Sequence, residues 1–115
     1  MNNRDLEILK KIVSYCNEID NTQKRFGSSF TAMQSDSIYK NAVSMCILQI
    51  GELTTHLTEE FKIKHNLMPW QDIKGMRNIA AHHYGKFDDQ KLWETISGDI
   101  PDLKEYCEKL IGQQK

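Results

Sequence analysis

The longest helical pattern of this chain is SDSIYKNAVSMCILQIGELTTHLTEEFKIKH, residues 35–65. Apolar side chains recur along it at intervals of three and four residues, which is the period of a helix that buries one face. The members of this apolar stripe are Ile38, Ala42, Met45, Cys46, Ile50, Leu53, Leu57 and Phe61. The stripe predicts one helix of roughly seven turns, beginning near Ser35 or Asp36 and ending near His65.

A second helical pattern precedes this one. Apolar residues spaced three and four apart run from about Asn3 to Arg25, and the pattern ends before Gly27. Gly27, Ser28 and Ser29 predict a turn, because these residue types favour chain reversals over regular structure. No segment alternates apolar and polar residues with β-branched enrichment, so no strand is predicted.

Proline, aspartate and glycine mark the expected helix ends in the second half of the chain. Pro69 suits the first position of a third helix, where its missing N–H would be unpaired anyway, and Gly85 is expected to end that helix. Asp88 predicts the N-cap of a short fourth helix, Gly98 its end, and Pro101 the start of a last helix. The patterns together predict an all-α protein, an antiparallel bundle of four to five helices.

The cysteines and tryptophans are expected to be structural. Cys16, Cys46 and Cys107 are odd in number, widely separated and set in apolar helical patterns, which indicates reduced core residues rather than a disulfide framework. Trp70 and Trp93 fall on apolar faces, so we expect core anchors rather than platforms for base stacking.

Length and composition favour one globular domain, residues 1–115. The chain has 39% hydrophobic and 27% charged residues, and its N-terminus opens polar, without the apolar region of a secretion signal. The apolar runs are too short to cross a membrane. Reduced cysteines are typical of the cytoplasm, so a soluble cytoplasmic protein without a membrane partner is expected.

Charge is distributed unevenly along the chain. The formal net charge is −1, but residues 62–87 hold five cations against one acid, a local charge of +4 that leaves −5 for the rest. His65, His82 and His83 lie in the same window. Such a window predicts a surface for a polyanion or an acidic partner, and its structural alternative is ordinary solvated charge.

Several chemistries are excluded by spacing. The sequence has neither of the glycine-rich loops that hold nucleotide phosphates, nor the pair of histidines four residues apart that grips zinc on a helix. His82 and His83, being adjacent, point to different sides of a helix. No metal and no cofactor is therefore predicted.

The stretch RNIAAHHYGKFD, residues 77–88, concentrates polar chemistry where a helix is expected to end. Arg77 and His82 are five residues apart, which separates them by about 140° on a regular helix, whereas Asn78 lies almost directly below His82. Arg77 and His82 can converge in two ways: either His82 sits where the helix frays, or a second subunit presents its helix end across a two-fold axis.

The same stretch resembles a known family. Its first eight residues match the Arg-x4-His-x-Tyr signature of HEPN-domain toxins of the HepT type. The likeness runs from about Arg4 to Ile111 and includes IGEL (residues 50–53), PW-x2-I-x-GMRN (69–78) and LW-x2-I-x2-DIP (92–101). It implies a HEPN-like bundle that forms a homodimer, with two Arg-x4-His motifs facing each other in one cleft.

The implied activity is metal-independent cleavage of RNA. Arg77 would hold the phosphate through its planar, permanently charged guanidinium, and His82 would transfer protons, since imidazole titrates near neutral pH. Asn78 would orient the ring or the phosphate, and His83 leaves open which histidine acts. Lys74 and Lys86 would position the RNA backbone, unless both are merely solvated charges.

The resemblance also implies a partner, since HepT-type proteins are the toxins of type VII-like HepT/MNT toxin–antitoxin systems. Tyr84 would receive AMP from an MNT-type nucleotidyltransferase antitoxin, which would block the cleft. Whether the antitoxin inhibits by this modification, by complex formation or by both is left open by the sequence. The structural alternative for Tyr84 is a packing residue. Asp36 and Glu52 would face the cleft as accessory groups, or serve as an N-cap and as surface charge respectively.

Two other functions remain open from the sequence. A non-catalytic HEPN subunit that binds nucleotide or RNA, or docks a nucleotidyltransferase, would have the same fold. An inert dimeric scaffold is less compatible with the intact Arg-x4-His-x-Tyr motif.

Overall fold

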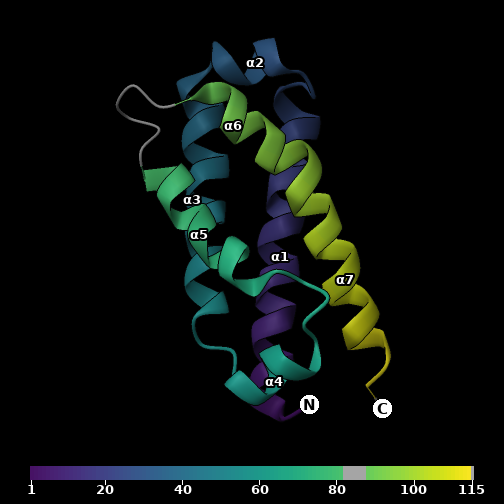
Figure 1. Ribbon diagram of the computed structural model, residues 1–115. Helices are drawn as coiled ribbons and strands as arrows, with labels where there is room; N and C mark the ends of the chain where they lie inside the picture. The colour runs from purple at the N-terminus through teal and green to yellow at the C-terminus, as the bar shows by residue number, and fades with distance from the viewer. Residues whose placement is uncertain (82–87, 115) are drawn as a thin grey trace.

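The computed structural model describes residues 1–81 and 88–114, and in these ranges all regular secondary structure is helical (Figure 1). The predicted all-α bundle is confirmed. In chain order its elements are α1 (Asn3–Phe26), α2 (Phe30–Gln34), α3 (Ser37–Thr54), α4 (Glu59–Lys64), α5 (Trp70–Ala81), α6 (Asp89–Glu94), the π-helical segment η1 (Thr95–Asp99) and α7 (Ile100–Gly112).

Helices α1, α3, α5 and α7 form the body of the bundle. Helix α3 packs against both α1 and α5, and α1 packs against α7 as well. Figure 1 shows that α1 and α3 run in opposite directions, with α2 across one end of the bundle and α4 at the other, where both termini lie. Helix α3 is therefore the central element that connects α5 to the rest.

Helix α1 has the bounds that the sequence predicts. The side chain of Asn2 accepts a hydrogen bond from the backbone N–H of Asp5 and caps the first turn. At the other end, the N–H of Gly27 donates to the carbonyl of Gln23, and Gly27 has a φ of 111°, which favours glycine. The expected turn at Gly27, Ser28 and Ser29 is followed by α2, a short helix that the sequence pattern did not indicate.

The predicted seven-turn helix is wrong, because it is divided into two. Helix α3 ends at Thr54, and α4 begins after Thr58, whose hydroxyl accepts a hydrogen bond from the N–H of Phe61. The buried Asp5 carboxylate accepts from the N–H and the hydroxyl of Thr58, at 3.0 and 2.8 Å. These two hydrogen bonds fix the segment between α3 and α4 against α1. Leu57, within that segment, is buried, so the apolar spacing continues from α3 into α4.

The buried face of α3 also differs from the predicted stripe. Ile38 and Met45 are 66% and 54% exposed. The core-facing side chains lie one or two positions further along, and they include Tyr39, Val43 and Ile47. Apolar residues occur on both sides of this helix, so spacing alone selected a face that is only half correct.

Asp88 caps α6 as predicted, since its carboxylate accepts from the N–H of Gln90. Gly98, however, does not end the helix: it lies within η1, and helical structure continues from Asp89 to Gly112. Its φ is not positive, so Gly98 lacks the left-handed conformation of a helix-terminating glycine. Pro101 lies in the first turn of α7, and Gly85 is outside the described residues.

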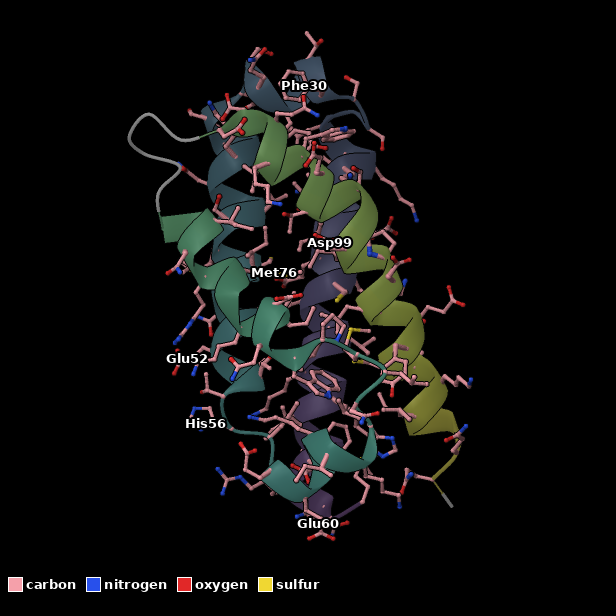
Figure 2. All side chains as sticks on the ribbon, in the orientation of Figure 1. Phe30, Glu52, His56, Glu60, Met76 and Asp99 are labelled. Carbon is pink, nitrogen blue, oxygen red and sulfur yellow. The ribbon has the colours of Figure 1, made fainter. Side chains whose placement is uncertain are left out.

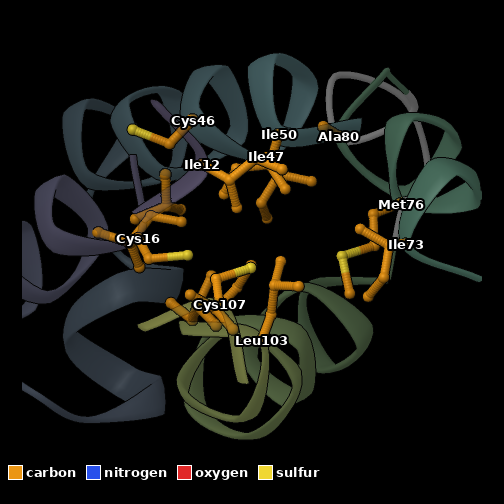
Figure 3. Close-up of a cluster of buried hydrophobic side chains, with 14 of the residues drawn as sticks. Ile12, Cys16, Cys46, Ile47, Ile50, Ile73, Met76, Ala80, Leu103 and Cys107 are labelled. Atoms are coloured by element: carbon orange, nitrogen blue, oxygen red, sulfur yellow. The ribbon is translucent and has the colours of Figure 1, made fainter. Parts of the chain in front are cut away.

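The core contains the three cysteines, as Figure 3 shows. All three are free and buried, and burial raises the pKa of each thiol to about 12. Trp70 is buried and Trp93 partly buried against the core, so both anchor the packing as expected. Within residues 1–81 and 88–114, no helix combines the length and apolar character needed to cross a bilayer.

Candidate active site

Arg77 is held on the surface between α5 and α3. Its Nη1 donates to Oε2 of Glu52 at 2.8 Å, which joins the last turns of the two helices. The Arg77 side chain is 36% exposed and that of Glu52 is 55% exposed. Solvent therefore screens the pair. Of the five N–H donors of the guanidinium, the contact with Glu52 uses one among residues 1–81 and 88–114.

Gly51 makes this reach possible. A methyl group added at Gly51 would collide with Cγ of Arg77, and it would stand 3.3 Å from the carbonyl oxygen of Lys74. The arginine stem therefore crosses α3 at the one position in that turn without a side chain. Gly51 lies between Ile50, which is buried in the core, and Glu52, which is exposed.

A histidine adjoins the same carboxylate. Nε2 of His56 lies 3.8 Å from Oε1 of Glu52, one helical turn further along. Figure 2 shows Glu52 and His56 on the same outer side of the bundle, near the end that carries α4. Arg77, Glu52 and His56 thus form a surface row in which one carboxylate contacts two basic groups.

The other predicted site residues divide into three groups. Lys74 and Asn78 lie on α5 and are exposed, with Lys74 one turn before Arg77. Asp36 caps α3, accepting from the N–H groups of Ile38 and Tyr39, so its structural interpretation is confirmed. The remaining predicted residues, His82, His83, Tyr84 and Lys86, lie outside the described residues.

Glu52 is an exposed glutamate that forms an ion pair with Arg77, the predicted catalytic arginine. Gly51 and His56 were not predicted as site residues. A glycine inside a helical pattern costs about 1 kcal/mol relative to alanine, and it signals a close approach of another chain segment. The four-residue spacing of Glu52 and His56 is likewise a sequence signal for a helical pair.

The arrangement suits the binding of an anion. Arginine offers a planar fork that matches a phosphate, and a carboxylate beside it holds the fork in one orientation. Among residues 1–81 and 88–114, no group of three or more histidine, cysteine, aspartate or glutamate side chains is placed to hold a metal ion.

Residues 1–81 and 88–114 form an all-α bundle, which agrees with the HEPN-like fold that the sequence resemblance implies. Residues 6–110 match the family described as ribonuclease HepT-like. The chain belongs to this family.

Individual relatives carry consistent names. A protein of Caldanaerobacter subterraneus subsp. tengcongensis named "Putative RNase" is 33% identical over 89 residues, covering 77% of this chain and 80% of that protein. A Methanocaldococcus jannaschii protein with the same description is 30% identical, covering 96% and 95%. "Probable ribonuclease HepT" of Thermococcus cleftensis is 38% identical, covering 60% and 63%. No solved structure matches the chain significantly.

Proposed function

We propose that this chain is a metal-independent endoribonuclease and the toxin of a toxin–antitoxin pair. The observation that carries the proposal is the Arg77–Glu52 pair, because it holds a guanidinium that can bind phosphate at the surface, five residues before the signature histidine. Membership of the ribonuclease HepT-like family supports the same activity.

The reaction follows from the two signature side chains. His82 removes the proton from a ribose 2′-hydroxyl, whose oxygen then forms a bond to the adjacent phosphorus. The bond from phosphorus to the 5′-oxygen breaks, and a protonated histidine donates a proton to that leaving oxygen. Arg77 stabilises the negative charge that builds on the phosphoryl oxygens. The products are a 2′,3′-cyclic phosphate and a 5′-hydroxyl.

The active unit is a homodimer in this proposal. Helix α5 is regular up to Ala81, and a five-residue spacing on a regular helix directs Arg77 and His82 to different sides. A two-fold axis would bring the arginine of one subunit to the histidine of the other. Each of the two Arg77–His82 centres in the shared cleft would then need both chains.

Control by an antitoxin completes the proposal. An MNT-type nucleotidyltransferase would transfer AMP from ATP to the hydroxyl of Tyr84, two residues beyond His82 in the sequence. The added phosphodiester carries a negative charge, so it would repel RNA as well as obstruct the cleft.

The test is cleavage of single-stranded RNA by the purified protein in EDTA. We expect cleavage with a 2′,3′-cyclic phosphate end, no cleavage of DNA of the same sequence, and loss of at least a hundredfold in rate in Arg77→Ala and His82→Ala. Arg25→Ala removes an exposed arginine from the end of α1 and serves as the control. RNA binding without cleavage would favour the non-catalytic subunit, and activity lost on chelation would contradict the mechanism.

A further inference from the structure

A hollow of about 450 Å³ lies between the end of α3, helix α4 and the start of α5. This volume is in the range of sites that take small ligands. Its walls combine apolar, amide and cationic groups: Met68, Pro69 and Trp70 on one side, and Asn66, Lys62 and Lys74 among the polar ones.

The hollow lies about one turn from Arg77 along α5. Lys74 lines it and precedes Arg77 by three residues, so the two cations share a face of α5 about 4.5 Å apart along the axis. An RNA strand whose phosphate contacts Arg77 can therefore reach Lys74 at the edge of the hollow.

Charge distinguishes this side of α5 from the other. The hollow has two lysines and one acid, Glu59, whose carboxylate lies 3.5 Å from Nζ of Lys62. Lys74 is exposed, and no ion pair is recorded for it among residues 1–81 and 88–114.

A second hollow, between α5 and the segment from α6 to α7, contains three aspartates, namely Asp72, Asp99 and Asp102, against the single cation Lys91. Its acidic walls would repel a phosphate chain. An RNA strand at Arg77 is therefore directed toward the hollow of Lys62 and Lys74.

We propose that the hollow of Lys62 and Lys74 takes one unpaired nucleotide of the RNA, next to the phosphate bound by Arg77; this rests on the proposed function. Lys74 contacts the backbone phosphate, and the base lies against the apolar wall of Met68 and Pro69. The Asn66 amide has both a donor and an acceptor, so it can form hydrogen bonds with the edge of the base. The hollow thus gives the enzyme a preference for one base beside the cleavage point.

The test uses 2′-O-methyl trinucleotides of the four single-base sequences, which lack the hydroxyl needed for cleavage. Binding to the wild-type protein is followed by NMR, and base preference at the cut is read from sequenced cleavage products. We expect one trinucleotide to bind best and to shift the signals of the residues that line the hollow. Lys74→Ala should weaken the binding of all four trinucleotides to a similar extent, roughly fivefold or more. Asn66→Ala should reduce the ratio of affinities between the best-bound trinucleotide and the others, also by roughly fivefold or more.

Asn21→Ala, on the exposed side of α1, and Asp102→Asn, in the acidic hollow, are the controls and should keep the wild-type preference. Thermal unfolding shows whether each variant is folded. If no trinucleotide shifts the lining residues, or if Asn66→Ala and Lys74→Ala bind and cut like wild type, the subsite is wrong. Binding in the hollow without any RNA cleavage would instead contradict the proposed ribonuclease and leave the nucleotide site standing.

Discussion

We expect Glu52 to orient the guanidinium of Arg77 while contributing little to stability, because the pair is exposed to solvent. The pair with Arg77 is short, at 2.8 Å, but both side chains reach solvent. Exposed ion pairs of this kind contribute about 0–1 kcal/mol to folding. In the proposed mechanism the contact therefore acts mainly on the orientation of the guanidinium. It also leaves a carboxylate next to the proposed phosphate site, where a negative charge would oppose RNA binding.

We predict that Glu52→Gln lowers kcat for RNA cleavage by about tenfold, because Arg77 loses its charged tether. KM should stay unchanged or fall, since a negative charge near the RNA is removed. The free energy of unfolding should change by less than about 1 kcal/mol. Steady-state cleavage and chemical denaturation measure these quantities, with Glu7→Gln, an exposed glutamate on α1, as the control. A rise in KM with unchanged kcat would show that Glu52 acts in binding.

Gly51 permits a test of the crossing between α3 and α5. Gly51→Ala should lower RNA cleavage at least tenfold, because the new methyl group occupies the path of the Arg77 stem. Gly75→Ala is the matched control on α5: an added methyl group there meets nothing within 4 Å. It should keep its activity and gain up to about 1 kcal/mol of stability from helix propensity. Equal activity in both variants would show that Arg77 does not need this path.

At the scale of elements, the sequence is most informative where a helix end has its own chemical signal. Helix α1 has Asn2 before it and Gly27 after it, and both bounds were predicted closely. The division between α3 and α4 was missed because Leu57 and Phe61 continue the apolar spacing. Thr58 followed by two glutamates is an N-cap signature, and it was the available signal for the break.

The break between α3 and α4 depends on a contact distant in sequence, which no local pattern can show. Asp5, only 2% exposed, binds Thr58 through both carboxylate oxygens. We predict that Asp5→Ala lowers the free energy of unfolding by about 2–3 kcal/mol, since a partly buried N–H and a partly buried hydroxyl lose a charged acceptor. Asp5→Asn, which retains one acceptor, should lose less.

Asp20→Ala removes an exposed carboxylate paired with Lys24 in the same helix, so it should cost no more than about 0.5 kcal/mol. Chemical denaturation at neutral pH compares the three variants. An Asp5→Ala protein as stable as Asp20→Ala would show that α4 is held by its apolar contacts alone.

At the scale of the whole molecule, the helical class followed from periodicity, whereas the packing of α3 did not. Ile38 and Met45 fit a helical stripe as well as Tyr39 and Val43 do, and only the neighbouring helices decide which pair is buried. The candidate site likewise combines a residue that the sequence predicts with a contact that it does not predict. Arg77 was predicted from its motif, but its path across Gly51 depends on how closely two helices approach in three dimensions.

The remaining question at this scale is whether one chain or two build the catalytic centre. In the proposed homodimer, the shared cleft holds two catalytic centres, each of which combines Arg77 of one subunit with His82 of the other. Arg77→Ala and His82→Ala homodimers then lack activity, because every centre misses one group. In a mixed dimer, one centre has lost both groups and the other has kept both.

We therefore predict that coexpressing the two inactive variants in equal amounts restores about a quarter of the wild-type RNA cleavage, since random pairing makes half of the dimers mixed and each mixed dimer has one complete centre out of two. Light scattering should give twice the chain mass of 13.4 kDa. Arg77→Ala coexpressed with itself under a second tag controls for the pairing. If mixed dimers form and remain inactive, Arg77 and His82 of the same chain must act together, and the helix end after Ala81 would have to turn His82 toward Arg77.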